Sequence, residues 1–391
     1  MQNMQASSPP PAPVSPDQQI QLLLNADKPQ EAEAVARSLL QAQAAPLRIW
    51  QLLILALRAQ RRYEEIRNIQ AHLVNARPFD LSMRFDLAET SLMLGDFDRG
   101  WKEYHYRYSL PHTTRIERKV QVPRWDGSPM PGKTLLIHDE QGFGDTFQFI
   151  RMVPWAKKRS GARVVLEIGK ETLPFAQRLE GIDQVVPYGE LPPPFDSHCE
   201  LMSLPMAMGL KMSDLPGPMP YLKANPDHIE RWKKRLADLR RPLIALTWSG
   251  RPFPNPRRSI PLETLAPLAK TGFTFVSIQK GHKPEAGFTI PEGLNLIDLE
   301  SEITDFEDTA AIMSIADLSV SIDSAPIHLA GAMGRPGWLM LLYNADWRWL
   351  HERADSPWYP SLRLFRQPKK DDWESVINRI SDELKELSKE K

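Results

Sequence analysis

The strongest constraint on the fold is an alternation of short apolar runs with amphipathic stretches, which covers most of the chain after residue 133. Six runs have the length and composition of buried strands, at 134–138, 163–168, 243–248, 273–278, 294–298 and 318–322. Stretches between them, such as 146–159 and 305–316, have the residue spacing of helices. Strands that alternate with helices in this way indicate βαβ units and parallel sheets.

This alternation starts twice, near residue 133 and near residue 242, with the proline-bounded segment 214–226 between the two starts. We therefore expect an α/β fold with two facing, doubly wound Rossmann-like domains, at 133–225 and 226–391. Residues 1–16 are polar and rich in proline, and we expect them to be disordered because they cannot bury enough apolar surface. Residues 111–132 lack periodicity and are interpreted as a connector.

A helical pattern repeats within residues 17–110. Second helices of successive pairs are expected to begin at Pro29, Tyr63 and Phe97, each 34 residues after the one before. This is the period of tetratricopeptide helix pairs, although Pro29 stands where that repeat has an aromatic residue. We expect an all-α, tetratricopeptide-like domain, with a plain helical bundle as the alternative, and we interpret its aromatic residues as core.

The net charge and the cysteine content indicate which binding partners and which cellular compartment suit the protein. The chain has 49 basic and 49 acidic residues, so nothing in its net charge favours nucleic acid or anionic lipid. Cys199 is the single cysteine, which excludes an intramolecular disulfide within this sequence and fits a reducing compartment. We find neither a signal peptide nor an apolar run of about 20 residues, and we expect a cytoplasmic protein with no membrane span.

Two motif matches are rejected on their context. Residues 127–134 fit the phosphate-loop pattern, but a strand follows them where that motif requires a helix. Asp96 and Asp98 resemble an Asp-x-Asp metal motif, but they lie at the start of a predicted helix, where aspartate acts as a cap.

The most informative motif is the Asp-Ser-Ala-Pro turn at 323–326, which links an apolar run to a helix of small residues. The unpaired backbone N–H groups and the positive dipole end of such a helix form an anion site. Asp323, Ser324 and Ala325 are therefore expected to hold a nucleotide diphosphate.

A glycine-containing loop follows the first strand and carries Glu140, Gly142, Gly144 and Asp145. Its glycines permit a sharp turn and close approach of a substrate. A carboxylate at the carboxyl edge of a parallel sheet is well placed to act as a general base, which is one role for Asp145. The alternative is that Asp145 only caps the following helix.

Further polar residues follow strands of the second domain. Guanidinium groups bind phosphate through paired hydrogen bonds, and the loop at 248–261 contains three arginines, although a solvated basic loop is the alternative. The candidate binding residues here are Ser249, Gly250, Arg258 and, after the next strand, Gln279.

Several ordered motifs together resemble the GT-B glycosyltransferases of the heptosyltransferase type over residues 130–370. The whole layout is similar to bacterial tetratricopeptide-repeat glycosyltransferases, which are related in layout to O-GlcNAc transferase. The motifs are EQGFGD at 140–145, WSG with RRSIP at 248–261, FVSIQKG at 275–281, DSAPIHLAGAMGRP at 323–336 and DWRWLHERADSPWYP at 346–360.

This resemblance implies a metal-independent transfer, usually with inversion, from a nucleotide sugar that serves as co-substrate, with no further cofactor. Asp145 would be the catalytic base, and Arg258 would grip the diphosphate beside Ser249. His328, one helical turn after the 323–325 turn, would be a donor-site or catalytic residue, or a packed helix residue. Ala325 departs from the glycine that heptosyltransferases commonly have there.

The C-terminal segment is rich in tryptophan. Trp347, Trp349 and Trp358, with polar neighbours such as Arg348, could stack on a sugar, although packing against the sheet is the alternative. The resemblance further implies that 346–360 line the cleft and that a last helix, near 371–388, crosses back onto the first domain. It also implies that 133–225 are the acceptor domain, with Glu140, Gly142 and Gly144 as acceptor-loop residues, and that 226–391 are the nucleotide-sugar domain.

These features predict a glycosyltransferase whose helical repeats recruit a protein or glycan acceptor. Two alternatives stay open: a non-catalytic adaptor that keeps the fold, and a lipopolysaccharide-core heptosyltransferase. The sequence leaves the donor sugar, the base, the acceptor and the oligomeric state undefined.

Overall fold

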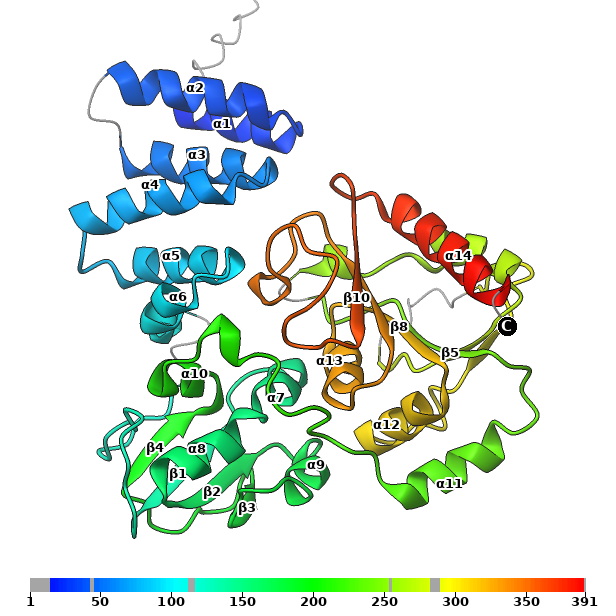
Figure 1. The fold of residues 1–391 in the computed structure, drawn as a ribbon. Coiled ribbons are helices and arrows are strands. Elements are labelled where there is room, and N and C mark those ends of the chain that lie inside the picture. The colour runs from blue at the N-terminus through cyan, green and yellow to red at the C-terminus, as the bar shows by residue number, and fades with distance from the viewer. Residues whose placement is uncertain (1–14, 43–45, 112–116, 253–254, 282–288, 390–391) are drawn as a thin grey trace, which may run out of the picture. The chain divides into compact units, whose positions relative to one another are not determined.

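The computed structural model describes residues 15–42, 46–111, 117–252, 255–281 and 289–389 (Figure 1). The chain divides into two compact units, residues 1–90 and residues 91–391. The predicted disorder of residues 1–16 falls outside the described residues except for Ser15 and Pro16, which begin the first helix.

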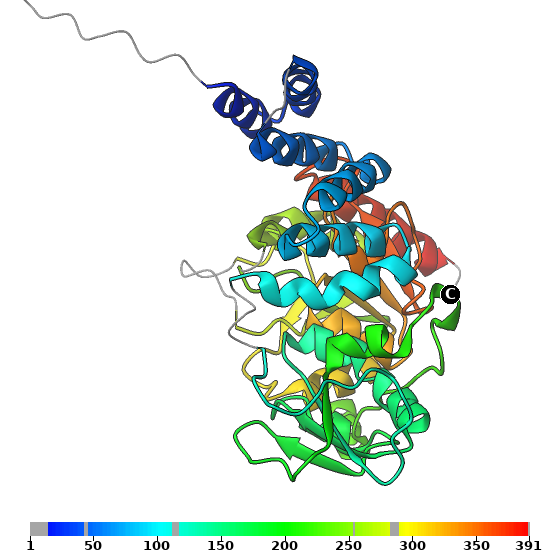
Figure 2. The same cartoon turned by 90° about the vertical axis from the view of Figure 1, so that its left-hand side faces the viewer.

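The first unit is helical, and its helices pack in chain order (Figure 2). They are α1 (Pro16–Asn25), α2 (Pro29–Ala42), α3 (Leu47–Ala59), α4 (Tyr63–Ala76) and most of α5 (Leu81–Met93), and α6 (Phe97–Tyr104) follows in the second unit. The second helices of the pairs begin at Pro29, Tyr63 and Phe97, as predicted from the 34-residue spacing. An all-helical N-terminal region is thus confirmed, and its tetratricopeptide character stays a prediction.

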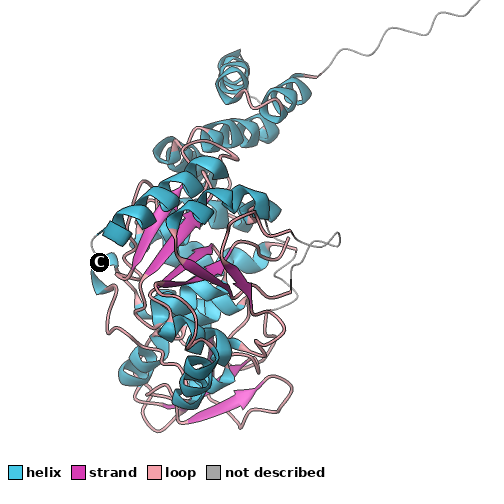
Figure 3. Ribbon diagram, turned by 90° about the vertical axis from the view of Figure 1, so that its right-hand side faces the viewer, coloured by secondary structure: helices cyan, strands magenta, loops and turns pink. Residues whose placement is uncertain are grey.

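The second unit contains two sheets in which every strand pair is parallel (Figure 3). The first has the order β3-β2-β1-β4, with β1 (Thr134–His138), β2 (Arg163–Ile168), β3 (Gln184–Pro187) and β4 (Ser197–Glu200). The second has the order β10-β9-β8-β5-β6-β7, with β5 (Leu243–Thr247), β6 (Thr274–Ser277), β7 (Leu296–Asp298), β8 (Leu318–Ile322), β9 (Gly337–Leu341) and β10 (Leu362–Arg366). All six predicted strands are present, and the mixed α/β class with parallel sheets is confirmed.

The helices of the second unit fall into two groups, according to the sheet that they surround. Those around the first sheet are η1 (His105–Ser109), α7 (Phe143–Phe149), α8 (Met152–Ser160), α9 (Leu173–Gln177), η3 (Leu201–Ser203), α10 (Leu204–Met208) and η4 (Met212–Asp214). Those around the second are α11 (Pro226–Arg235), η5 (Pro256–Arg258), η6 (Leu262–Thr271), α12 (Phe306–Ile315), α13 (Ala325–Ala332), η7 (Trp347–Trp349) and α14 (Trp373–Lys389). The stretch 146–159, predicted as one helix, is divided between α7 and α8.

The C-terminal helix differs from the expectation. The apolar side chains of α14, including Val376, Ile377 and Ile380, belong to the same core as Leu265 of η6 and Phe275 of β6. The main contacts of α14 are with η6 and β10. The helix therefore covers its own sheet instead of crossing back onto the first domain, because its amphipathic face completes the core of the second sheet.

The connector before β1 has an ordered role. Residues 123–125 run beside β4, where Trp125 N donates to His198 O at 2.7 Å and His198 N donates to Pro123 O at 3.1 Å. The phosphate-loop pattern at 127–134 leads into β1, and Asp96 caps α6 by accepting from Arg99 N at 3.2 Å, so both rejections are confirmed. No helix in the described part of the chain is both long and apolar enough to span a bilayer.

Candidate active site

The turn after β8 leads directly into α13. Ser324 is its N-cap residue with φ −156° and ψ 170°, and the Ser324 side chain makes no capping hydrogen bond. Pro326, in the first turn, has no N–H to satisfy. The N-cap side chain therefore leaves the positive end of the helix dipole available to a bound anion.

Arg258 lies against the same turn. Its Nη1 donates to Asp323 O at 3.1 Å, and its Nη2 donates to Arg251 O at 3.1 Å. Its Nε is buried and has no hydrogen-bond partner among the described residues. A Cβ built on Gly250 would lie 3.1 Å from that Nε, so the glycine leaves the space that the guanidinium occupies. The structure thus brings Arg258, Gly250 and the start of α13 together, as predicted.

Ser249 and Gln279 form the supporting part of this region. The Gln279 side-chain oxygen accepts from Ser249 N at 2.9 Å, and its Nε2 donates to Ser249 O at 3.0 Å. Gln279 is buried, so its amide is committed to the backbone that follows β5. The Gln279 amide thus fixes this loop, and its contact with a donor stays a prediction.

His328 is buried within an aromatic environment on α13. Its Nδ1 is 3.0 Å from the Tyr359 hydroxyl, its ring centroid is 5.1 Å from that of Trp349, and its Nε2 is 3.7 Å from an oxygen of Asp323. Burial raises the pKa of Asp323, but the hydrogen bond and charge of His328 outweigh it, so the net shift is downward. His328 is a packed helix residue that also holds the Asp323 carboxylate.

Asp145 joins the two sheet-containing halves of this unit. One carboxylate oxygen accepts from Gly142 N at 3.0 Å, which is the capping role weighed in the sequence. The other accepts from Arg348 Nη2 at 2.6 Å. Asp145 therefore both caps α7 and pairs with an arginine from the opposite half.

Arg348 as the partner of Asp145 was not found from the sequence. Asp346 caps the short helix η7 and binds Arg348 Nη1 at 2.8 Å, which holds the side chain toward Asp145. Burial alone lowers the pKa of Arg348, but the charges of Asp346 and Asp145 raise it well above its usual value. The Asp-Trp-Arg-Trp sequence was the available signal, although nothing in it indicates which carboxylate the arginine reaches.

Helices α7 and α13 meet near their N-terminal ends. A Cβ built on Gly144 would lie 2.9 Å from His328 Cδ2 and 3.7 Å from Ala325 Cα. These helices are in contact, and they lie side by side in Figure 1. The candidate base on one half therefore lies close to the candidate anion site on the other.

Glu140 does not have the exposed position expected of an acceptor-loop residue. It pairs with Arg107 at 2.7 Å, and both side chains are 1% exposed. Arg107 comes from η1 and also donates to Ser203 Oγ at 2.9 Å, so a buried polar cluster encloses the carboxylate. Burial raises the pKa of Glu140 to about 7 even though Arg107 opposes the shift.

The tryptophans of the C-terminal segment pack internally. Trp347 and Trp358 are buried and lie 5.4 and 6.5 Å from Trp101 of α6, measured between ring centroids. Trp349 is also buried, against His328. These three tryptophan rings therefore pack inside the protein and are not exposed for stacking on a sugar.

Two clusters among the described residues have the composition of metal ligands, namely His138, His198 and Glu200, and His228, Asp305 and Asp308. Neither cluster includes a donor-site candidate.

Comparisons with known proteins give distant matches, and no protein-family model matches the chain. Protein FlbA of Caulobacter vibrioides is 29% identical over 343 residues, which cover 80% of this chain and 56% of FlbA. The chain therefore spans little more than half the length of that relative.

Several of the solved structures that match are glycosyltransferases by name. ADP-heptose lipopolysaccharide heptosyltransferase II of E. coli is 16% identical, with a TM-score of 0.47 over 66% of this chain and 100% of that one. A mutant O-GlcNAc transferase of Thermobaculum terrenum is 13% identical, with a TM-score of 0.31 over 95% of this chain and 91% of that one. Likeness at this level does not by itself identify the chain.

Proposed function

We propose that this protein is a glycosyltransferase that moves a sugar from a nucleotide-sugar donor to a hydroxyl of a protein or glycan acceptor. The observation that carries the proposal is the buried, unpartnered Nε of Arg258 beside the uncapped N-terminus of α13. Both features favour a bound anion, and a diphosphate fits a site with two separate sources of positive charge.

In the proposed reaction, the acceptor oxygen forms a bond to the anomeric carbon as the bond from that carbon to the diphosphate breaks. The diphosphate leaves with the electron pair, and Arg258 with the first turn of α13 stabilises its charge. The helix end and Arg258 supply this stabilisation from the protein itself, which supports a transfer that needs no metal ion. Direct attack would invert the anomeric configuration.

Asp145 is proposed to take the proton of the acceptor hydroxyl. Its place next to the anion site supports this role, because a base must lie within hydrogen-bond reach of the attacking group. Arg348 holds the carboxylate in that position. The wall of the donor site would be formed by Ser249, Gly250, Asp323, Ser324 and Ala325. Gln279 and His328 would hold these wall residues in place.

The N-terminal helices are proposed to be a tetratricopeptide-like region that holds the acceptor, and the protein is proposed to act in the cytoplasm. The 34-residue recurrence of the second helices supports the first point. The names of the structural neighbours make ADP-heptose a natural donor to test. A heptosyltransferase acting on lipopolysaccharide and a non-catalytic adaptor are the competing proposals.

Turnover of a panel of nucleotide sugars tests the proposal. We expect the wild type to release nucleoside diphosphate from one of them, and Asp145→Asn to lower the rate by about 10²- to 10⁴-fold. Asp372→Asn is the matched control, because Asp372 also bonds a backbone N–H at the start of a helix, at 3.0 Å to Ser375, outside the site. An adaptor would give no turnover in any of the three proteins.

A further inference from the structure

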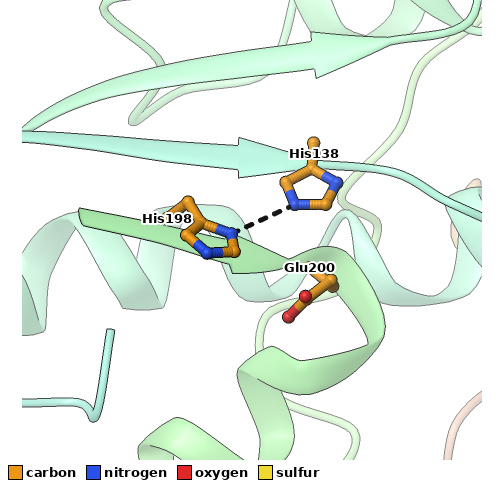
Figure 4. A group of neighbouring side chains, drawn as sticks. All are labelled: His138, His198 and Glu200. Atoms are coloured by element: carbon orange, nitrogen blue, oxygen red, sulfur yellow. Dashed lines mark hydrogen bonds between the residues drawn. The ribbon is translucent and has the colours of Figure 1, made fainter. Parts of the chain in front are cut away.

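A group of potential metal ligands lies on one face of the first sheet. His138 ends β1, and His198 and Glu200 lie two residues apart on β4. In the parallel register, His138 is opposite Glu200, and His198 is opposite Leu136. Because alternate residues of a strand face the same side, the three side chains share one face, and Figure 4 shows them turned toward one another.

Their spacing suits a tetrahedral ion. His138 Nε2 and His198 Nδ1 are 3.4 Å apart, and one ligand atom from each of the three residues lies within 4.8 Å of the others. Two nitrogens bound to the same tetrahedral zinc at roughly 2.0–2.1 Å are about 3.4 Å apart. The imidazole pair thus has the separation of two zinc ligands, and a small side-chain movement brings in the carboxylate.

The ligand atoms are buried and partly unsatisfied. His138, His198 and Glu200 are 3%, 2% and 0% exposed. One oxygen of Glu200 accepts from Arg124 Nε at 2.8 Å, whereas its Oε2 is buried with no hydrogen-bond partner among the described residues. A buried carboxylate oxygen without a partner is costly, and a bound cation would satisfy it. Arg124 would then orient the carboxylate from outside the ligand set.

The second cluster lacks this property. Asp308 Oδ1 accepts from His228 and Trp232, both at 2.9 Å, and from Arg231, and its Oδ2 accepts from Thr304 N and Oγ1 at 2.9 and 2.8 Å. Both carboxylate oxygens are therefore occupied by donors. His228 and Asp308 form a structural network, and this network provides an internal control.

We propose that His138, His198 and Glu200 bind a zinc-type transition-metal ion, with the fourth position open to water. Two imidazoles and one carboxylate favour such an ion over magnesium or calcium, which prefer oxygen ligands. The ion would link β1 to β4 and stabilise the first sheet. This site is separate from the proposed donor site, and the inference does not depend on sugar transfer.

Metal binding by the full-length protein tests the inference. After removal of metal with a chelator, we expect the wild type to take up one equivalent of zinc and to give the visible absorption of tetrahedral cobalt when cobalt(II) replaces it. His138→Gln and His198→Gln should weaken binding by about tenfold or more. His228→Gln, in the control cluster, should bind like the wild type. Zinc should raise the Tm of the wild type and of His228→Gln only.

Three results would overturn the inference: no stoichiometric zinc in the wild type, unchanged binding in both His138→Gln and His198→Gln, or an equal loss in His228→Gln. If the first two variants do not fold, the wild-type cobalt spectrum decides. A tetrahedral spectrum supports the site, and an octahedral one contradicts it.

Discussion

At the scale of single residues, the contact between Asp145 and Arg348 is the one that most changes the interpretation of the sequence. The two residues are 203 positions apart, and the bond at 2.6 Å crosses between the two halves of the second unit. Each motif could be recognised separately because its residue types are distinctive. The pairing could not, since it depends on how α7 and η7 are oriented in space.

Arg348 is predicted to position Asp145. Arg348→Lys keeps the charge but loses the planar group that reaches both Asp145 and Asp346 at 2.6 and 2.8 Å. We expect kcat to fall by about tenfold or more while the KM for the donor changes little, because other residues are proposed to hold the donor phosphates. Arg353→Lys, whose partner is the exposed Asp355, is the control. Steady-state kinetics in which only KM changed would contradict a positioning role.

Glu140 shows how a residue-scale prediction fails. Its position between a strand and a glycine-rich loop suggested contact with an acceptor, but Arg107 binds it in the interior. The arginine comes from η1, far from the loop in sequence, and its sequence context gave no sign of this contact.

At the scale of elements, the predicted strands have continuous apolar runs, whereas three of the missed ones, β3, β4 and β10, have other compositions. The fourth missed strand, β9, reads Gly-Trp-Leu-Met-Leu and was missed although it is apolar and buried throughout. β4 reads Ser-His-Cys-Glu and is buried throughout, which no hydrophobicity pattern indicates. β10 includes two arginines, and β3 has only four residues. A polar strand next to a charged connector can be buried because side chains such as Arg124 pair with it.

The closeness of α7 to α13 gives a prediction about Gly144. A methyl group there would lie 2.9 Å from the His328 ring, which is buried and has little room to move. We expect Gly144→Ala to destabilise the protein by about 1–3 kcal/mol and to lower activity.

Gly142→Ala is the matched control for that variant. Gly142 has φ −80°, which any residue adopts, and its Cβ would lie 3.4 Å from the Asp145 carboxylate. Chemical denaturation of both variants measures the difference. Equal stability of Gly144→Ala and Gly142→Ala would show that the helices are less closely packed than described.

At the scale of the whole molecule, buried carboxyl groups predict how stability depends on pH. Burial raises the pKa of Glu140 from 4.5 to about 7 and that of Asp139 from 3.8 to about 6. Between about pH 4.5 and 7 these two carboxyl groups therefore hold more protons in the folded state than in the unfolded state, whereas His105 and His138, whose pKa values burial lowers to about 4 and about 3, hold fewer. The contribution of the two carboxyl groups to the free energy of unfolding should therefore fall as the pH rises through this window, while that of the two histidines should rise.

The variant Glu140→Gln tests this pH dependence because it removes the titrating group. Between pH 5 and 7.5 the unfolding free energy of the wild type should fall relative to that of Glu140→Gln, by up to roughly 3 kcal/mol. Glu190→Gln, at an exposed position, should leave the curve unchanged. Urea titrations at several pH values measure it, and parallel wild-type and Glu140→Gln curves would contradict the assignment.

At this same scale, Arg258 and the N-terminus of α13 are proposed to hold the diphosphate of a nucleotide sugar. Calorimetric titration of the full-length protein with a panel of nucleoside diphosphates tests it most directly, with Arg258→Ala compared against Arg257→Ala. Arg257 is the adjacent arginine, exposed and paired with Asp371.

We expect the wild type and Arg257→Ala to bind one of these diphosphates with similar affinity, and Arg258→Ala to bind it at least about tenfold more weakly. No binding to any nucleoside diphosphate, or equal binding by Arg258→Ala and the wild type, would contradict it.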